Sequence, residues 1–109
     1  MAEMSKEQAA LEQSASELES RRREMYRALA EKLCLAIADS EGVDFGATFR
    51  LSQKVLEKSD LEMSRLFKVS RPTVGRWSRG ITAPHPMMRR AVYELLQSQL
   101  QERLRANRA

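Results

Sequence analysis

The stretch from Ser59 to Gly80, SDLEMSRLFKVSRPTVGRWSRG, decides the fold of this 109-residue chain. It contains two short segments of helical composition, residues 61–67 and residues 71–79, separated by the three-residue turn Lys68-Val69-Ser70. Ser59 or Asp60 can cap the first segment, and Gly80 can end the second. The stretch therefore predicts two short helices joined by a tight turn.

The residue types in this stretch predict which side of each helix is buried. Met63 and Phe67 are four residues apart, and Val74 and Trp77 are three apart, so each pair lies on one helix face. We expect the buried contact between the two helices to be made by Met63, Ser64, Phe67, Val69, Val74 and Trp77. The arginines of the second segment then face outward, as in a helix that contacts bases in a DNA groove. This is the pattern of a helix-turn-helix.

The rest of the sequence predicts more helices and no strand. Residues 1–40 contain neither Gly nor Pro and are rich in strong helix formers. Gly42 would end that helix in a left-handed cap, Asp44 or Thr48 would start the next, and Pro86 would start the last. We predict an all-α chain of about five helices, with a long N-terminal helical arm in residues 1–40, a helix-turn-helix domain in residues 43–98, and a C-terminal helix extension with a basic tail in residues 99–109. The arm is expected to dock on the core from Met25 onward.

Apolar residues in the N-terminal segment follow a heptad-like spacing. Leu11, Ala15, Leu18 and Met25 alternate four and three apart if Arg22 is counted, which suits a coiled coil. Two interpretations are open: an intermolecular coiled coil, or an intramolecular helix that lies across the domain. The C-terminal helix offers a second surface, so the candidate dimer seam comprises Leu11, Leu18, Met25, Leu96, Leu100 and Leu104.

Positive charge is concentrated in the second half of the chain. The whole chain has a net charge of +4, but residues 60–109 contain ten basic and four acidic residues, and nine of the ten are arginines. Arginine pairs well with phosphate and with guanine, so we expect a polyanionic partner. The alternative is a charged surface that keeps a small protein in solution.

The run from Val69 to Gly80, followed by Pro84, resembles the phage-repressor (Xre-like) helix-turn-helix family. The shared pattern is a turn hydrophobe, a Ser cap, a Thr and a Val, an Arg-aromatic step and a closing Gly. The resemblance covers about residues 49–96 and excludes the N-terminal arm. It implies that bases are contacted by Arg71, Thr73 and Arg76, and that phosphates are contacted by Ser59, Lys68, Ser70, Arg79 and Thr82.

Three residues depart from the family pattern. Lys68 stands where the family usually has Gly, and a left-handed conformation there costs about 1 kcal/mol. Either a phosphate contact of Lys68 offsets that cost, or the turn is altered. Pro72 disfavours a helical Arg71, so either Ser70 caps the helix or Arg71 is itself the boundary. Gly75 lies in mid-helix, where its missing side chain would allow close approach to the DNA backbone.

We expect a sequence-specific double-stranded DNA-binding transcription regulator of a bacterium, phage or plasmid, by default a repressor. It would act as a homodimer on a palindromic site, with helix 71–79 of each copy in the major groove. The alternative is a protein-interaction module, such as an antitoxin or plasmid-maintenance factor, that binds its partner through the arm and has modest DNA affinity. We do not expect an enzyme, because no paired-carboxylate site, Ser/His/Asp set or phosphate-binding Gly loop is present.

The composition also limits cofactors and location. The longest apolar run is six residues, Leu33 to Ala38, so no membrane span is expected, and the first residues do not resemble a secretory signal. We therefore expect a cytoplasmic protein. A single Cys and a single His leave no internal disulfide and no Cys/His zinc site, so neither a metal nor a cofactor is expected. Cys34 is expected to be buried, and His85 to be a capping or loop residue.

Overall fold

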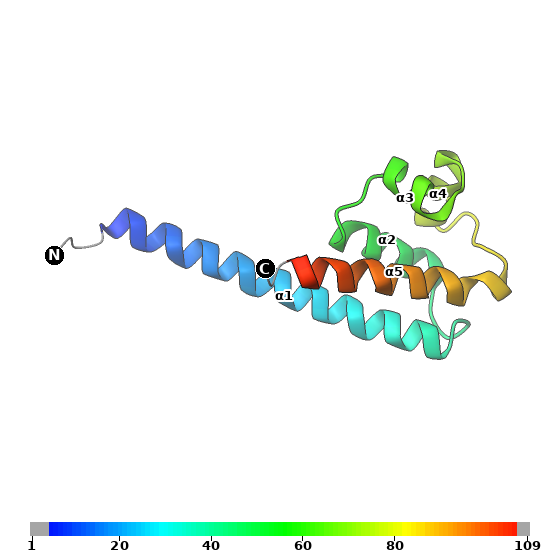
Figure 1. Cartoon of the computed structure of the whole chain (residues 1–109), viewed down its shortest axis with the longest axis horizontal. Coiled ribbons are helices and arrows are strands. Elements are labelled where there is room, and N and C mark those ends of the chain that lie inside the picture. The colour runs from blue at the N-terminus through cyan, green and yellow to red at the C-terminus, as the bar shows by residue number, and fades with distance from the viewer. Residues whose placement is uncertain (1–4, 107–109) are drawn as a thin grey trace.

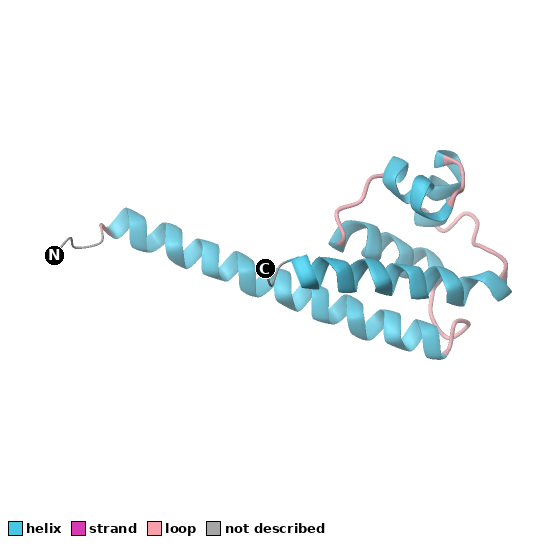
Figure 2. Cartoon of the chain, in the orientation of Figure 1, coloured by secondary structure: helices cyan, strands magenta, loops and turns pink. Residues whose placement is uncertain are grey.

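The computed structural model describes residues 5–106, which form five helices and no strand. The helices are α1 (Lys6–Ala38), α2 (Phe45–Val55), α3 (Asp60–Phe67), α4 (Arg71–Ser78) and α5 (Pro86–Ala106). The predicted all-α class and helix number are therefore confirmed for this part of the chain (Figure 2). No helix within residues 5–106 is long and apolar enough to cross a membrane.

The long helix α1 extends well beyond the rest of the molecule. Its second half packs beside α5 and α2, whereas its first half projects away from them (Figure 1). The helix begins with a capping box, in which the Ser5 hydroxyl accepts a hydrogen bond of 3.1 Å from the backbone amide of Gln8. At the other end Asp39 is the cap, and the expected left-handed cap at Gly42 is wrong. The Gly42 amide instead donates to the carbonyl and the carboxylate of Asp39, which close the turn without a positive φ.

The docked half of α1 and the inner face of α5 share one apolar core. Leu29 and Leu33 of α1 are fully buried, as are Tyr93 and Leu96 of α5. This part of α1 therefore packs on the core, although Met25 itself is 42% exposed. Cys34 is exposed rather than buried, because it follows Leu33 and faces away from α5.

Part of the candidate dimer seam is wrong. Leu96 and Leu100 are 0% and 1% exposed in the single chain, where the docked half of α1 covers the face of α5 on which they lie. Leu104 is half-buried against the same core. These leucines complete the fold of one chain, so only Leu11, Leu18 and Met25 of the seam remain exposed.

An aromatic cluster joins α2 to α4. The Trp77 ring meets Phe45 and Phe49 edge-on, with centroid distances of 5.7 and 5.6 Å. A close backbone approach supports this contact, since a Cβ at Gly46 would lie 3.0 Å from the Cα of Gly80. Gly80 also has a φ of +73°, so the chain can leave α4 in a direction that other residues adopt only with strain. The two glycines thus let α2 and the end of α4 pack closely.

The segment from α3 to α4 matches the predicted pair of short helices. Met63, Ser64, Val74 and Trp77 are buried, while Phe67 and Val69 are partly buried against the core. Lys68 is left-handed, with φ 57° and ψ 44°, so the turn keeps the conformation for which the family usually has Gly. The Ser70 hydroxyl caps α4 by accepting from the Thr73 amide at 3.2 Å. Ser70 is therefore the cap, and Arg71 and Pro72 are the first two helical residues.

Replacing Tyr93 with Phe should raise the stability of the fold. The Tyr93 hydroxyl is the one buried side-chain polar atom in residues 5–106 without a hydrogen-bond partner. An unpaired buried hydroxyl costs about 1–3 kcal/mol, so Tyr93→Phe is expected to raise the free energy of unfolding by about 1 kcal/mol. Burial also raises the pKa of Tyr93, so the wild type should lose stability above about pH 10. Urea denaturation followed by circular dichroism measures both effects.

Tyr26→Phe is the matched control, because Tyr26 is also buried but receives a hydrogen bond from Arg103. Loss of this hydrogen bond in Tyr26→Phe should lower the free energy of unfolding by about 1 kcal/mol. A Tyr93→Phe variant that is destabilised as much as Tyr26→Phe would contradict the argument.

Replacing Lys68 with Gly should also stabilise the fold. The left-handed backbone of Lys68 is strained for a residue with a Cβ, and Gly removes that strain, for an expected gain of about 0.5–1 kcal/mol. The matched control is Arg65→Gly in the exposed interior of α3, which should cost about 1 kcal/mol. A loss of stability in both variants would refute the expected strain at Lys68. Thermal unfolding at neutral pH provides the measurement.

Candidate nucleic-acid interface

The outward face of α4 carries the residues expected to contact bases. Val74 is fully buried and Trp77 is 7% exposed, so these two side chains fix which face of α4 points into the core. Arg71 is exposed at the first helical position, and Thr73 and Arg76 are half-buried. All three expected base-contacting residues thus belong to one short helix that is anchored on its opposite face.

Thr73 links the cap of α4 to Arg76. Its Oγ1 lies 2.7 Å from Oγ of Ser70 and accepts from Nη2 of Arg76 at 3.3 Å. Because Ser70 also accepts from the Thr73 amide, the three residues form a short chain of hydrogen bonds along the start of α4. The Arg76 guanidinium is therefore held over the first turn of α4, with its remaining donors free of any intrachain hydrogen bond in residues 5–106. The Arg71 side chain makes no hydrogen bond or ion pair within the same residues.

The five residues expected to contact phosphate do not form one cluster. Arg79 is exposed at the end of α4 and borders a groove toward α2. Lys68 borders an apolar hollow between the turn and α5, and Thr82 borders a different hollow near Asp44. Ser70 lies at the start of α4, where Thr73 engages its hydroxyl.

Ser59 is a poor phosphate ligand in this arrangement. Its hydroxyl accepts from the Glu62 amide at 3.1 Å, and its own amide donates to the Glu62 carboxylate at 3.2 Å. The hydrogen bonds from the backbone and the side chain of Ser59 lower the pKa of Glu62, which keeps this carboxylate charged. A carboxylate that occupies the start of α3 repels a phosphate approaching the same end.

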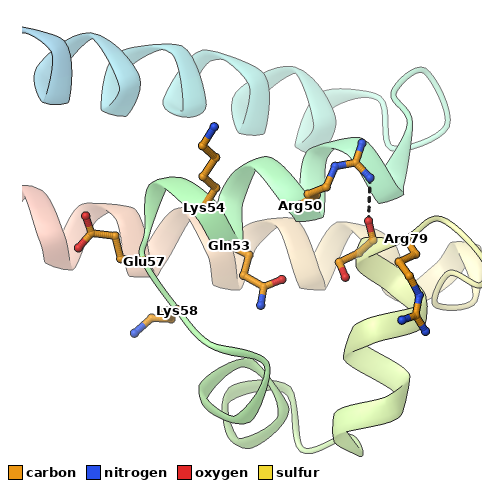
Figure 3. A pocket seen from close by; sticks show the side chains of 7 residues that line it. Arg50, Gln53, Lys54, Glu57, Lys58 and Arg79 are labelled. Atoms are coloured by element: carbon orange, nitrogen blue, oxygen red, sulfur yellow. Dashed lines mark hydrogen bonds between the residues drawn. The ribbon is translucent and has the colours of Figure 1, made fainter.

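The structure contains a basic groove between α2 and the end of α4 that the sequence analysis did not predict. Arg50, Lys54 and Lys58 line it together with Arg79, and Glu57 is its acidic member (Figure 3). Arg50 donates through Nη1 to the Ser78 carbonyl at 2.8 Å, which ties α2 to the last residue of α4. Glu57 lies toward the other end and accepts from Arg103 at 3.4 Å. We call Arg50, Lys54, Lys58 and Arg79 the basic groove.

A signal for the basic groove was present in the sequence. Arg50, Lys54 and Lys58 are spaced four residues apart, which places the first two on one face of α2. Residues 25–59 carry no net charge, and net charge does not distinguish one side of a helix from the other. The cationic face of α2 was therefore not recognised. The groove can bind an extended anion, since four cationic side chains border a single open hollow.

The polar side chains at the start of α5 make contacts within the chain. His85 accepts from the Met87 amide through Nδ1 at 3.2 Å, as expected of a residue at the start of α5. Arg89 donates to the Pro84 carbonyl, and Arg90 forms an ion pair with Glu94. Within residues 5–106, no group of three or more His, Cys, Asp or Glu side chains comes together as a metal site.

The chain therefore has a short helix with an outward arginine at its start, a second arginine one turn along it, and a basic groove at its end. No protein family model, no curated protein and no solved structure matches this chain.

Proposed function

We propose that this chain is a sequence-specific double-stranded DNA-binding protein that regulates transcription through a helix-turn-helix made of α3 and α4. The observation that carries the proposal is that one face of α4 is buried and apolar while the other face carries arginines. Val74 and Trp77 anchor one face in the core, while Arg71 and Arg76 project from the other. A short anchored helix with outward arginines has the dimensions and the donors needed to enter a major groove.

Arg76 is the main base-contacting residue in this proposal. A guanidinium can donate two parallel hydrogen bonds to O6 and N7 of guanine, a pair worth about 1–3 kcal/mol of discrimination. The hydrogen bond to Thr73 restrains the Arg76 side chain before DNA arrives, so less conformational freedom is lost on binding. Arg71, one residue after the cap, extends the contact toward the N-terminal end of α4.

The basic groove would position the protein on the DNA backbone. Phosphate contacts carry no sequence information, but they supply affinity and fix the angle at which a helix enters the groove. Arg79 belongs both to the end of α4 and to the basic groove, so a strand that passes α4 would continue toward Lys54. Lys68, Ser70 and Thr82 are secondary candidates for phosphate contacts.

We further propose that two copies act together on a palindromic site and repress transcription by blocking access of RNA polymerase. One eight-residue helix contacts few base pairs, and a second copy adds the base contacts of a second half-site, which increases sequence specificity. Such a protein would act in the cytoplasm of a bacterium, on chromosomal, phage or plasmid DNA.

The second candidate function is a protein-interaction module of the antitoxin or plasmid-maintenance type. The exposed first half of α1 favours it, because a helical arm of that length provides a surface separate from α4. In that case, α4 would add only modest DNA affinity. Failure to select any DNA sequence, together with tight binding of the arm to a different protein, would identify this function.

Selection from a random duplex library tests the base-contacting role of α4. We expect the wild type to enrich a sequence with a guanine preference in each half, and Arg76→Ala to lose that preference with an affinity loss of about 5–150-fold. Arg27→Ala, which removes an exposed arginine of α1 remote from α4, is the matched control and should enrich the wild-type sequence. Equal enrichment by wild type and Arg76→Ala would refute the assignment.

The salt dependence of binding tests the basic groove. Lys54→Ala should weaken binding to all duplexes by a similar factor and reduce the slope of log affinity against log salt by about one. The enriched sequence should not change, since Lys54 is expected to contact only phosphate. Lys32→Ala on α1 is the control and should leave the slope as in the wild type. The same slope for Lys54→Ala and wild type would show that DNA does not lie in the groove.

A further inference from the structure

In the described part of the chain, no other segment packs against the first half of α1. Every side chain from Lys6 to Met25 is exposed, and we call this segment, residues 6–25, the arm. Two large apolar residues on it, Leu11 and Leu18, are 70% and 61% exposed. The arm extends beyond the end of α5 as a single helix (Figure 1).

The arm repeats the apolar pattern that α1 buries in the core. Leu11, Ala15 and Leu18 recur eighteen residues later as Leu29, Leu33 and Ala36. Eighteen residues are five full turns of an α-helix, so the two sets lie on the same side of α1. The second set is fully buried in the core shared with α5, and the first set is exposed. The arm therefore carries an unoccupied continuation of the surface that α5 covers.

The outer part of the arm is acidic, and the part next to the core is basic. Residues 6–20 contain one lysine and four glutamates, whereas residues 21–24 contain three arginines and one glutamate. Within residues 5–106 no ion pair joins these arginines to the glutamates of the arm, so both sets are available to a partner. A parallel copy of the arm in register would align like charges. An antiparallel copy would set the acidic outer part of each arm against the arginines of the other.

We infer that the arm binds a second copy of this chain in the antiparallel direction. The partner arm would lie on the row formed by Leu11, Ala15, Leu18 and Met25, in line with α5. The direction agrees with α5, which itself runs antiparallel to α1 in the docked half (Figure 1). With Leu11 of each arm opposite Met25 of the other, residues 11–25 would overlap over about 22 Å, and the two bodies would lie at opposite ends.

This pairing has a consequence for DNA that rests on the proposed function. Because α3 and α4 lie at the end of the molecule away from the arm, the two α4 helices would be held farther apart than the arm overlap (Figure 1). The docked part of each α1, residues 26–38, adds about 20 Å on either side of the overlap, so half-sites should be separated by more than one turn of DNA, which is about 34–36 Å. The association of the arms needs no DNA, so it can be tested even where the proposed function fails.

Sedimentation of the full chain without DNA tests the association. The mass should rise from 12.5 kDa toward twice that value with increasing protein concentration. Leu18→Gln should raise the dissociation constant at least tenfold. Leu35→Gln is the matched control, since Leu35 is 65% exposed on the same helix but outside the arm, and it should behave as the wild type. A monomer at every concentration, or equal effects of the two variants, would overturn the inference, even if the arm bound a different protein.

Disulfide cross-linking tests the direction. In a Cys34→Ser background, Leu11→Cys and Met25→Cys are made as separate single-cysteine chains and oxidised alone or mixed. Antiparallel arms should give a covalent dimer mainly in the mixture, because Leu11 of one arm would lie near Met25 of the other. Efficient dimers of Leu11→Cys with itself would establish parallel arms and overturn the inference. Circular dichroism of each variant checks that the helical content is unchanged.

Discussion

The edge-on packing of Trp77 against Phe45 and Phe49 holds α4 in place, and the candidate interface depends on it. An eight-residue helix is too short to be stable alone in water, so α4 needs this contact to exist as a helix. Each aromatic pair adds about 0.5–1.5 kcal/mol beyond the burial of its area. Because Trp77 and Val74 occupy the inner face, Arg71 and Arg76 are left to the outer face.

The two surfaces that we propose for binding are separate and differ in chemistry. The first is rigid and cationic: Thr73 restrains Arg76, and the hydrogen bond from Arg50 to the Ser78 carbonyl ties the basic groove to α4. The second is the arm, a single helix with an apolar row and divided charge. A protein that recognises DNA as a pair of copies needs both kinds of surface, and α1 carries the arm as a continuation of the helix that packs on α2 and α5.

Features that depend on residues within one turn of each other could be predicted from the sequence. Pro86 was expected to start α5, and Ser59 was one of two candidate caps of α3, because both features depend on local hydrogen bonding and sterics. The choice between Ser70 and Arg71 as the start of α4 stayed open, because Pro72 and the Ser cap favour different starts. The Gly42 cap failed for a similar reason, since Asp39 offers a competing local hydrogen bond.

The sequence by itself determined the helices, the turn and the face of α4 that carries the arginines, because a period of 3.6 residues and the capping residues specify these locally. Only the tertiary structure decided what covers each apolar face: α1 buries Leu96 and Leu100 within one chain, whereas Leu11 and Leu18 have no cover. It also assembled Arg79 with Arg50, Lys54 and Lys58, which come from α2 and the turn after it, more than twenty residues earlier. Periodicity identifies an apolar or charged face, but the partner of that face depends on how distant segments pack.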